Sequence, residues 1–446
     1  MNVPAAPLPA NLERASRRAR VLDALGDGAL ILAAGRPSIY SRDVEARFRP
    51  DADFLYLTGL REPEAVLVLR PGAEAPYTLF VRPRVPEEEA WTGPRPGPEG
   101  AVSEYGADAA YPLAELETRL PDLLDGAARL CHAPWKNAAL DVTIRTALGR
   151  LAAKELFGRR APQVFVDPAV VLHEMRLVKS AFEIAKLERA AAVTTAGIRA
   201  GLARVAPGVT EYQVQAAVEH AFACEGAAGP GFETIAAAGA NGCVLHYVAN
   251  RATIGAGDML LLDAGAEVDD YNGDVTRTVP AAGRFAPAQR ALYEAVRETL
   301  DQLTEAVRPG ATMGLVREQA ARLLTARLVD LGLLAGSLDQ LVEDGSYKKY
   351  TLHGPSHWLG MDVHDVGAYR EKGAFRPFVP GMLMTMEPGL YVPPGDESAP
   401  LEFRGLAVRI EDDLLVTEDG CRALTRDLPV DADEVAALVG VAEDAV

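Results

Sequence analysis

The sequence predicts an α+β protein with a smaller N-terminal α/β domain and a larger C-terminal domain, in which a duplication would give two related α/β halves. Three observations predict this class. A chain of 446 residues is long for one hydrophobic core. Short apolar runs alternate with an amphipathic helical pattern in its first part. A helix, Pro-Gly, Thr, helix pattern occurs twice in its second part.

The N-terminal elements follow from local patterns. GALILAAG (28–35) and EAVLVLRPG (64–72) are predicted to be buried strands, because each is an apolar run that ends in a glycine or Pro-Gly turn. LAELETRLPDLLDG (113–126) has the spacing of an amphipathic helix. Residues 81–100 are rich in proline, glycine and charge, and we expect an exposed loop there. We assign residues 1–174 to this domain.

The C-terminal domain is expected to span residues 175–446 and to begin with a long helix over FEIAKLERAAAVTTAGIRAGLARV (182–205). Pro207-Gly208 and Pro309-Gly310 lie 102 residues apart, and each pair is followed by a threonine that suits a helix N-cap. Such punctuation is also common between unrelated helices. A duplication would imply two α/β halves with a cleft between them.

Two aspartates lie in a predicted hairpin over residues 257–280. Asp263 follows an apolar strand, and Asp274 begins the next one. A turn centred on Val268-Asp269 would place the two carboxylates opposite each other, which destabilises a sheet unless it is compensated. One carboxyl group is then protonated, or a cation lies between the two. If the turn lies elsewhere, one aspartate faces solvent.

Two further carboxylates end apolar segments. Glu387 closes GMLMTMEPG, where a contact with solvent is the ordinary role of a strand-end carboxylate. Arg409 and Glu411 share one face of GLAVRIEDD because the residues alternate with a period of two. The alternative interpretation of that pair is a surface ion pair on an edge strand.

Three of the seven histidines lie within twelve residues, in HGPSHWLGMDVHDVG (353–367), which we call the histidine loop. Its Gly-Pro pair disfavours a regular helix, so a packed loop or short strand is expected. Three imidazoles near strand-end carboxylates suit metal ligands and proton carriers. Four carboxylates and one imidazole match two divalent cations, with Mn²⁺ favoured by the oxygen-rich set and Zn²⁺, Co²⁺ or Fe²⁺ as alternatives.

Five stretches in this order resemble the pita-bread metallopeptidases, and most closely the bacterial proline-specific aminopeptidases (aminopeptidase P, Xaa-Pro aminopeptidase). They are NGCVLHY, LLDAGAEVDDYNGDVTRT, HGPSHWLGMDVHDVGAY, TMEPGLY and VRIEDD, which span most of residues 175–425. DFLYLTGLREPEAVLVL (53–69) is similar to the smaller domain of that family. The resemblance implies a C-terminal pita-bread fold and an N-terminal domain that serves oligomerisation or substrate access.

The resemblance also implies a role for each site residue. The implied dimetal ligands are Asp263, Asp274, His357, Glu387 and Glu411, of which Asp274 and Glu411 would bridge the metals. The implied catalytic residues are Glu387, His246, His364 and His353. Glu387 would activate the nucleophile and return a proton to the proline nitrogen. His246 and His364 would contact the scissile carbonyl, and His353 would line the proline pocket. Tyr369 and Arg409 would support the site, and the loop of Trp91 would reach a neighbouring subunit.

The implied activity is hydrolysis of the Xaa-Pro bond at the N-terminus of peptides, which releases the N-terminal residue through a hydroxide that bridges the metals. The substrates would be peptides with proline at the second position. A prolidase, which cleaves only Xaa-Pro dipeptides, is the nearest alternative. A non-catalytic binding module of the same fold is another, and a methionine aminopeptidase or a creatinase-like enzyme fits less well. Pro355 and Ala407 depart from the family pattern at positions that hold no ligand.

Composition restricts the classes of binding partner and the cellular compartment that we expect for this chain. The net charge of −18 disfavours nucleic-acid binding, because phosphate backbones would be repelled. We expect no membrane association, since the sequence lacks both a signal peptide and a run of about 18 apolar residues. The four cysteines form no metal-binding or disulfide pattern, which favours the cytoplasm. The resemblance of the Trp91 loop implies a homo-oligomer, a dimer or a tetramer.

Overall fold

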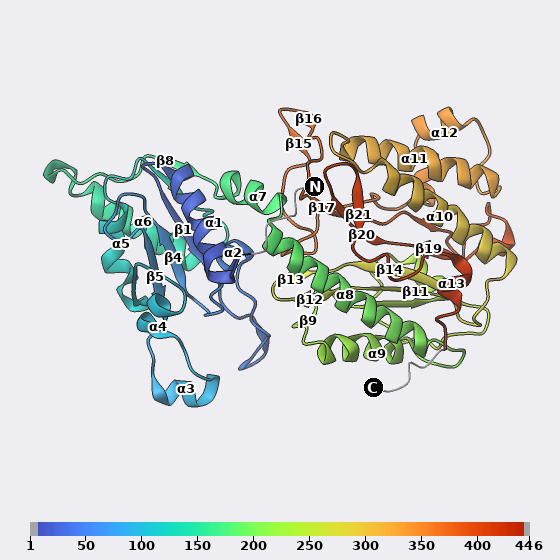
Figure 1. Ribbon diagram of the computed structural model, residues 1–446, viewed down its shortest axis with the longest axis horizontal. Helices are drawn as coiled ribbons and strands as arrows, with labels where there is room; N and C mark the ends of the chain where they lie inside the picture. Colours follow the sequence, from blue (N-terminus) through green and yellow to red (C-terminus); the bar gives the residue numbers. More distant parts are fainter. Residues whose placement is uncertain (1–7, 441–446) are drawn as a thin grey trace. The chain divides into compact units, whose positions relative to one another are not determined.

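The computed structural model describes residues 8–440 and divides into two compact units between Met175 and Arg176 (Figure 1). Both units mix helices with sheets, so the predicted α+β class is confirmed. Within the described range, no helix combines the length and the apolar character that crossing a membrane requires.

A six-stranded mixed sheet forms the centre of the N-terminal unit. Its order is β6 (Ala109–Pro112), β5 (Tyr77–Val81), β4 (Val66–Leu69), β1 (Ala29–Ala33), β7 (Arg129–Cys131) and β8 (Val164–Val166). Helices α1 (Ala10–Leu25) and α2 (Ala52–Thr58) belong to this unit, and α7 (Ala169–Leu177) begins in it and ends just past the division. Leucines of α5 (Leu116–Leu124) and α6 (Ala138–Ala152) pack with Ile31 and Val68 of the sheet in one buried cluster. The two predicted strands and the predicted helix are confirmed.

Residues 81–100 are mostly exposed or half-buried, but the prediction of a plain loop was wrong. They contain α3 (Pro86–Thr92) and the start of α4 (Gly97–Ser103). Each helix has a proline in its first positions, and three glutamates occupy the first turn of α3. Proline fixes a helical φ where its missing N–H does no harm, and acidic side chains favour a helix N-terminus. These features allow a short helix to form even in a segment rich in proline and glycine.

The C-terminal unit contains two helix pairs. They are α8 (Ala181–Arg204) with α9 (Glu211–Cys224), and α10 (Pro287–Ala306) with α11 (Met313–Asp330). Gly208 and Gly310 have φ values of +90° and +85°, which glycine adopts without strain. Thr312 caps α11, where its hydroxyl accepts from the Leu315 amide at 3.1 Å. The predicted helix, Pro-Gly, Thr, helix punctuation therefore occurs in both pairs.

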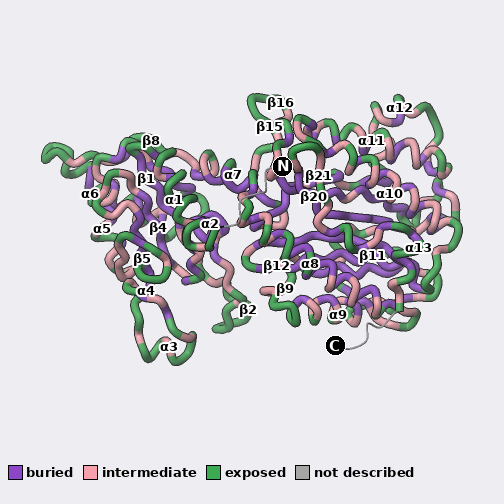
Figure 2. Tube along the Cα trace, viewed as in Figure 1, coloured by how far each residue is buried: buried purple, intermediate pink, exposed green. Residues whose placement is uncertain are grey.

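The strands of this unit form small antiparallel sheets between the helix pairs (Figure 1). One sheet contains β10 (Ile235–Ala238), β11 (Met259–Ala264) and β14 (Val275–Pro280), and another contains β17 (Leu383–Met386), β20 (Asp412–Val416) and β21 (Cys421–Ala423). A third pairs β18 (Gly389–Tyr391) with β19 (Ala407–Arg409). Helix α8 contacts β11 and β14, whereas α10 contacts β17, β18 and β19. Buried residues follow these strands (Figure 2).

The hairpin that carries the two aspartates forms, but its predicted register was wrong. Asp263 pairs with Thr276, and the turn is centred on Asp269-Asp270. Both turn residues have positive φ, at +50° and +77°, and aspartate tolerates that conformation in a two-residue hairpin turn. The hairpin turn thus lies one residue later in the chain than expected. Asp274 becomes the diagonal neighbour of Asp263 on the same face.

Gly265 and Gly273 allow the two hairpin segments to approach closely beside the aspartates. A β-carbon on Gly265 would lie 1.9 Å from the carbonyl oxygen of Gly273. We expect Gly265→Ala to lower the free energy of unfolding by about 1–3 kcal/mol, because backbone atoms must move to admit the methyl group. Chemical denaturation measures this change. Gly257→Ala is the control, since no atom lies within 4 Å of its added carbon; an equal effect of both variants would contradict the packing argument.

Candidate metal centre

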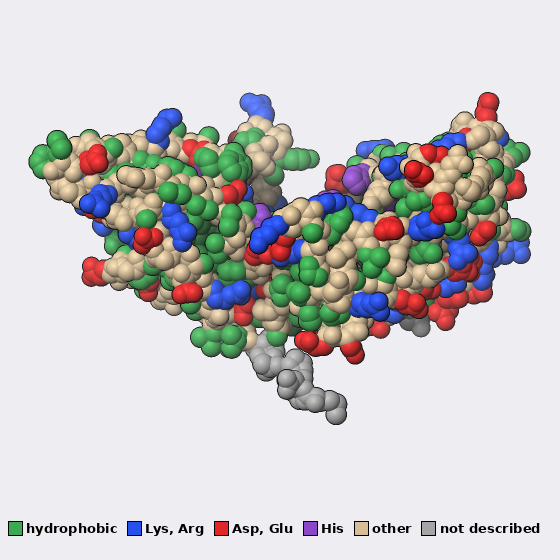
Figure 3. Space-filling view, turned by 90° about the horizontal axis from the view of Figure 1, so that it is seen from above, with side chains coloured by type: hydrophobic (Ala, Val, Ile, Leu, Met, Phe, Trp, Pro, Cys, Tyr) green, Lys and Arg blue, Asp and Glu red, His purple; other side chains and the backbone are tan. Residues whose placement is uncertain are grey.

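A pocket of about 850 Å³ opens in the C-terminal unit. Its lining includes Asp263, Asp274, His246, His353, His357, His364, Tyr369, Glu387, Arg409 and Glu411. All the predicted site residues of the C-terminal half therefore lie around one cavity, although they come from five separate stretches of the chain. The size is typical of a pocket for a small ligand. Histidine side chains are visible over the hollowed part of the surface in Figure 3.

Four carboxylates and one imidazole meet at the floor of this pocket. Ligand atoms of Asp274, His357 and Glu411 all lie within 4.8 Å of one another. Nε2 of His357 is 3.5 Å from Oδ2 of Asp274 and 3.5 Å from Oε1 of Glu387. The fourth carboxylate, Asp263, lies on the same face of the hairpin as Asp274. Strand ends from both halves of the unit thus place their acidic side chains in one small volume.

The orientation of His357 is fixed by its own backbone. Its Nδ1 is 3.0 Å from the carbonyl oxygen of Trp358, so Nδ1 carries the proton and donates. Nε2 therefore directs a free lone pair toward the carboxylates. Burial lowers the pKa of His357 to about 4, which keeps the ring neutral at physiological pH. A neutral imidazole held by a backbone acceptor is the form that binds a metal ion.

The acidic groups are strongly perturbed. Burial raises the pKa of Asp274 well above its usual range, and the charges of Glu411 and Asp263 raise it further. The pKa of Glu411 is raised by burial, Glu387 and Asp263. Burial also raises the pKa of Glu387 to about 8, although Arg409 opposes that shift. If these carboxylates are all ionised in so small a volume, additional positive charge is needed to offset their repulsion.

The residues present fit divalent cations. Among residues 8–440, Asp263 is the one carboxylate of the four that pairs with an arginine. The Oδ1 atom of Asp263 is buried and has no hydrogen-bond partner in the described part of the chain. A buried carboxylate oxygen is costly without a donor or a cation. An oxygen-rich set with one imidazole is the donor chemistry of a hard or borderline divalent metal.

Arg409 connects the acidic floor to the pocket wall. Its Nη2 lies 2.5 Å from Oδ2 of Asp263, and its Nη1 donates to the Tyr391 hydroxyl at 2.9 Å. The Tyr391 hydroxyl is 2.7 Å from Nε2 of His353. Thr276 Oγ1 accepts from Nε of Arg409 at 3.1 Å and donates to Glu411 at 2.7 Å. Arg409 and Glu411 are therefore buried neighbours, which contradicts the alternative of a surface ion pair.

Sequence reasoning missed Thr276 and Tyr391. A usable signal existed for Thr276, because a period of two places it on the same strand face as Asp274. No comparable signal marked Tyr391, whose position opposite the histidine loop depends on tertiary packing.

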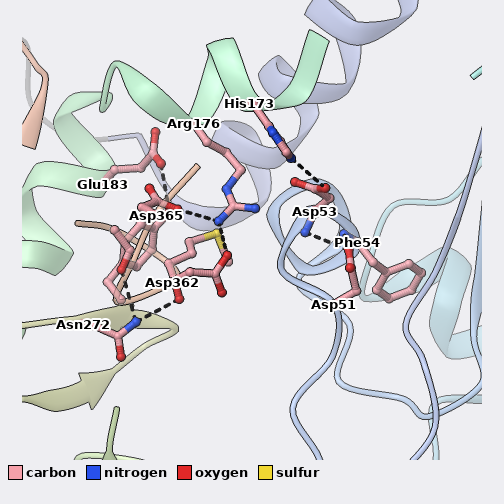
Figure 4. Close-up of polar contacts among 12 residues, drawn as sticks. Asp51, Asp53, Phe54, His173, Arg176, Glu183, Asn272, Asp362 and Asp365 are labelled. Carbon is pink, nitrogen blue, oxygen red and sulfur yellow. Dashed lines mark hydrogen bonds and ion pairs between the residues drawn. The ribbon is translucent and has the colours of Figure 1, made fainter. Parts of the chain in front are cut away.

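Ion pairs with Arg176 and Lys179 hold the histidine loop in place (Figure 4). The Arg176 guanidinium lies between two carboxylates, 2.7 Å from Asp362 and 2.6 Å from Asp365. Nζ of Lys179 is 2.7 Å from the other oxygen of Asp365. Both cations lower the pKa of Asp365 despite its burial. A loop without regular secondary structure thereby gains a fixed conformation.

The remaining predicted residues occupy different places. His246 and His364 are exposed on the pocket lining, and the His364 ring lies edge-on to that of His357 with centroids 4.4 Å apart. Tyr369 stacks on Trp358 at 5.2 Å and accepts from the Trp358 amide. Trp91 lies on α3 in the N-terminal unit, 90% exposed, and does not line the pocket.

Comparison with known proteins gives the family. The model of metallopeptidase family M24 matches residues 185–418, and that of the aminopeptidase P N-terminal domain matches residues 14–131. The Xaa-Pro aminopeptidase of Escherichia coli is 40% identical over 417 residues, which are 93% of this chain and 94% of the relative. The chain belongs to the aminopeptidase P family of M24 metallopeptidases.

Solved structures agree with this membership. Aminopeptidase PepP of Pseudomonas aeruginosa superposes on 97% of this chain and 98% of its own, with a TM-score of 0.94 and 42% identity. A zinc-substituted Escherichia coli aminopeptidase P in complex with product gives a TM-score of 0.93 and 37% identity, with 97% and 98% covered. The C-terminal unit is thus a pita-bread domain, and this aminopeptidase P family member is a metal-dependent hydrolase.

The carboxylate cluster predicts a pH-dependent gain of stability from metal. In the metal-free protein the pKa of Glu387 is about 8, against an ordinary value of 4.5. A raised pKa stabilises the fold at low pH, and this contribution is lost as the pH rises toward 8. Mn²⁺ competes with protons for the same oxygens, so we expect it to raise the melting temperature more at pH 8 than at pH 6.

Scanning calorimetry of chelator-treated protein, with and without Mn²⁺ at both pH values, measures this difference. Asp274→Asn should lose most of the shift, whereas Glu318→Gln, an exposed change on α11, should retain it. A shift of equal size at both pH values would contradict the assignment of the cluster as the metal site.

Proposed function

We propose that this chain removes the N-terminal residue from peptides whose second residue is proline. The observation that carries this proposal is the set of four carboxylates and one imidazole at the floor of an accessible pocket, in a chain of the aminopeptidase P family. An imide bond to proline has no N–H, so a site shaped for the ring is needed to cleave it. Peptides fit an acidic pocket that attracts a free amino terminus.

The metal centre is proposed to hold two divalent ions, with Mn²⁺ favoured by the oxygen-rich donors. Its ligands would be Asp263, Asp274, His357, Glu387 and Glu411. When bound, the ions would polarise the scissile carbonyl and lower the pKa of a coordinated water. Support comes from the unsatisfied Oδ1 of Asp263, the free Nε2 of His357 and the excess of buried negative charge.

Side chains of the protein would then transfer protons and stabilise developing negative charge. Glu387 lies 3.3 Å from Nδ1 of His353, and its carboxylate would accept a proton from the attacking water and return it to the leaving proline nitrogen. His246 and His364 would stabilise negative charge on the carbonyl oxygen. His353, held by the Tyr391 hydroxyl, would border the proline ring.

Three further proposals concern the whole protein. Exposed Trp91 on α3 supports a homo-oligomer in which the N-terminal unit completes or restricts access to a neighbouring pocket. The boundary between the two functional domains is proposed to lie near residue 175. The four cysteines are free, which supports a reducing compartment such as the cytoplasm.

Substrate length distinguishes this activity from that of a prolidase. With added Mn²⁺, we expect a peptide Ala-Pro-Ala-Ala to be cleaved after its first residue and faster than the dipeptide Ala-Pro, because the pocket is open. Ala-Ala-Ala-Ala should be cleaved poorly. Chromatography of the products with time measures all three. Cleavage of the dipeptide alone would assign a prolidase, and no cleavage with any metal would favour a binding module.

Loss of a ligand should abolish the reaction without unfolding the protein. We expect His357→Ala and Asp274→Ala to lower kcat/KM by at least about a thousandfold, since each removes a donor on which charge stabilisation depends. Circular dichroism checks folding, and metal content is measured on the same samples. Cys224→Ser, an exposed change on α9, is the control. Near-normal kcat/KM in metal-depleted His357→Ala would contradict the proposal.

A further inference from the structure

The pocket wall carries an arginine that has no role in the metal centre. Arg317 lies on α11 and lines the pocket with an exposed side chain. Its guanidinium carbon is 5.3 Å from the centroid of the Tyr369 ring. Its Nε lies 4.0 Å from the place that a β-carbon on Gly354 would take, and Gly354 directly follows His353. Arg317 therefore borders the part of the pocket next to the histidine loop.

The charge of Arg317 is not neutralised by the protein. No carboxylate among residues 8–440 lies within ion-pair distance of its guanidinium, although the chain has 63 acidic residues. Other arginines of α11 differ: Arg322 pairs with Asp339 at 2.9 Å, and Arg327 pairs with Glu298 at 2.7 Å. In the pocket itself, Arg409 is paired with Asp263. An unpaired guanidinium on a pocket wall is available to a ligand.

A second unpaired charge, of opposite sign, lies on another wall. Glu233 is exposed, lines the pocket and has no ion pair in the described part of the chain. It directly precedes Thr234 and β10, whereas Arg317 belongs to α11 beside Tyr369. The pocket thus presents free negative charge on its β10 wall and free positive charge on its α11 wall. A peptide, with an ammonium at one end and a carboxylate at the other, is oriented by such a pair.

We propose that Arg317 is a specificity-determining residue that binds a carboxylate on the proline-containing, leaving part of the substrate. This inference rests on the proposed function and deepens it, since it names the preferred class of peptide. The planar guanidinium offers paired donors that match a carboxylate. The same charge repels the substrate ammonium, which leaves the opposite end of the peptide as its partner. Short peptides with a free C-terminus, or peptides with an acidic residue soon after proline, carry the required group.

Arg317 would contribute to substrate binding and not to the chemical step. Arg317 lies beside Tyr369, with its guanidinium carbon 5.3 Å from the ring centroid, and it does not belong to the cluster of Asp274, His357 and Glu411. We therefore expect loss of Arg317 to act through KM and to leave kcat nearly unchanged for a substrate without the carboxylate. An ion pair with an exposed arginine supports a discrimination of about fivefold.

The test compares three peptides on the full-length, Mn²⁺-loaded enzyme: Ala-Pro-Ala, its C-terminal amide, and Ala-Pro-Glu amide. Wild type should have a kcat/KM about fivefold higher for either carboxylate-bearing peptide than for Ala-Pro-Ala amide. Arg317→Gln should reduce that ratio to about one through KM, and Arg317→Glu should reverse it. Arg322→Gln removes the same charge from the same helix away from the pocket, and it should keep the wild-type ratio.

The outcomes distinguish the role of Arg317 from the proposed peptidase activity. Preference for the free C-terminus alone, or for the glutamate side chain alone, identifies the source of the carboxylate and supports the role of Arg317. Equal ratios in wild type and Arg317→Gln, or an equal loss in Arg322→Gln, would overturn it while cleavage of the peptides continues. Failure of wild type to cleave any of the three would instead overturn the proposed function.

Discussion

Mutual repulsion among buried carboxylates is the constraint on which the rest of this structure depends. Asp263 and Asp274 come from the first half of the C-terminal unit, and Glu387 and Glu411 come from the second. Bringing them together desolvates all four acids, and the raised pKa values of Asp274, Glu387 and Glu411 show that these three groups favour the neutral form there. Packing the two halves together therefore raises the free energy of the metal-free site, and bound divalent cations would lower it.

The surrounding structure fixes this arrangement through the backbone. Arg277 is fully buried; it donates to the carbonyl of Glu411 at 2.6 Å and pairs with Asp412 at 2.8 Å. Asp413 accepts from the Asp274 amide at 3.2 Å. These bonds tie the strand of Asp274 to the segment of Glu411, so the two acids cannot separate to escape repulsion. Fixed donors at a site are what preorganised binding requires.

Much of this could be predicted from local sequence. The strands that carry Asp263 and Glu387 are apolar runs with a carboxylate at the end, and the Gly-Pro pair after His353 excluded a helix. The register of the hairpin could not be predicted, because it depends on which of several acidic residues accepts a positive φ in the turn. The two short helices at 86–103 were missed because proline was taken as a breaker rather than as a helix start.

Contacts between segments that are distant in the sequence could not be predicted from single motifs. Tyr391 reaches His353 only because the end of β18 packs beside the histidine loop. Arg176 lies near the end of α7, and its ion pairs with Asp362 and Asp365 join residues nearly two hundred positions apart. Polar residues of this kind have no periodic pattern, since their partners are set by the fold and not by their neighbours in the chain.

If the carboxylate cluster holds divalent metal, the number of ions bound per chain shows it. Equilibrium dialysis of purified protein against Mn²⁺, followed by elemental analysis, gives that number for wild type and for Asp274→Ala. We expect about two ions per wild-type chain and a loss of bound metal in the variant. Unchanged binding in Asp274→Ala, or no binding by a folded wild-type chain that still cleaves peptides, would contradict it.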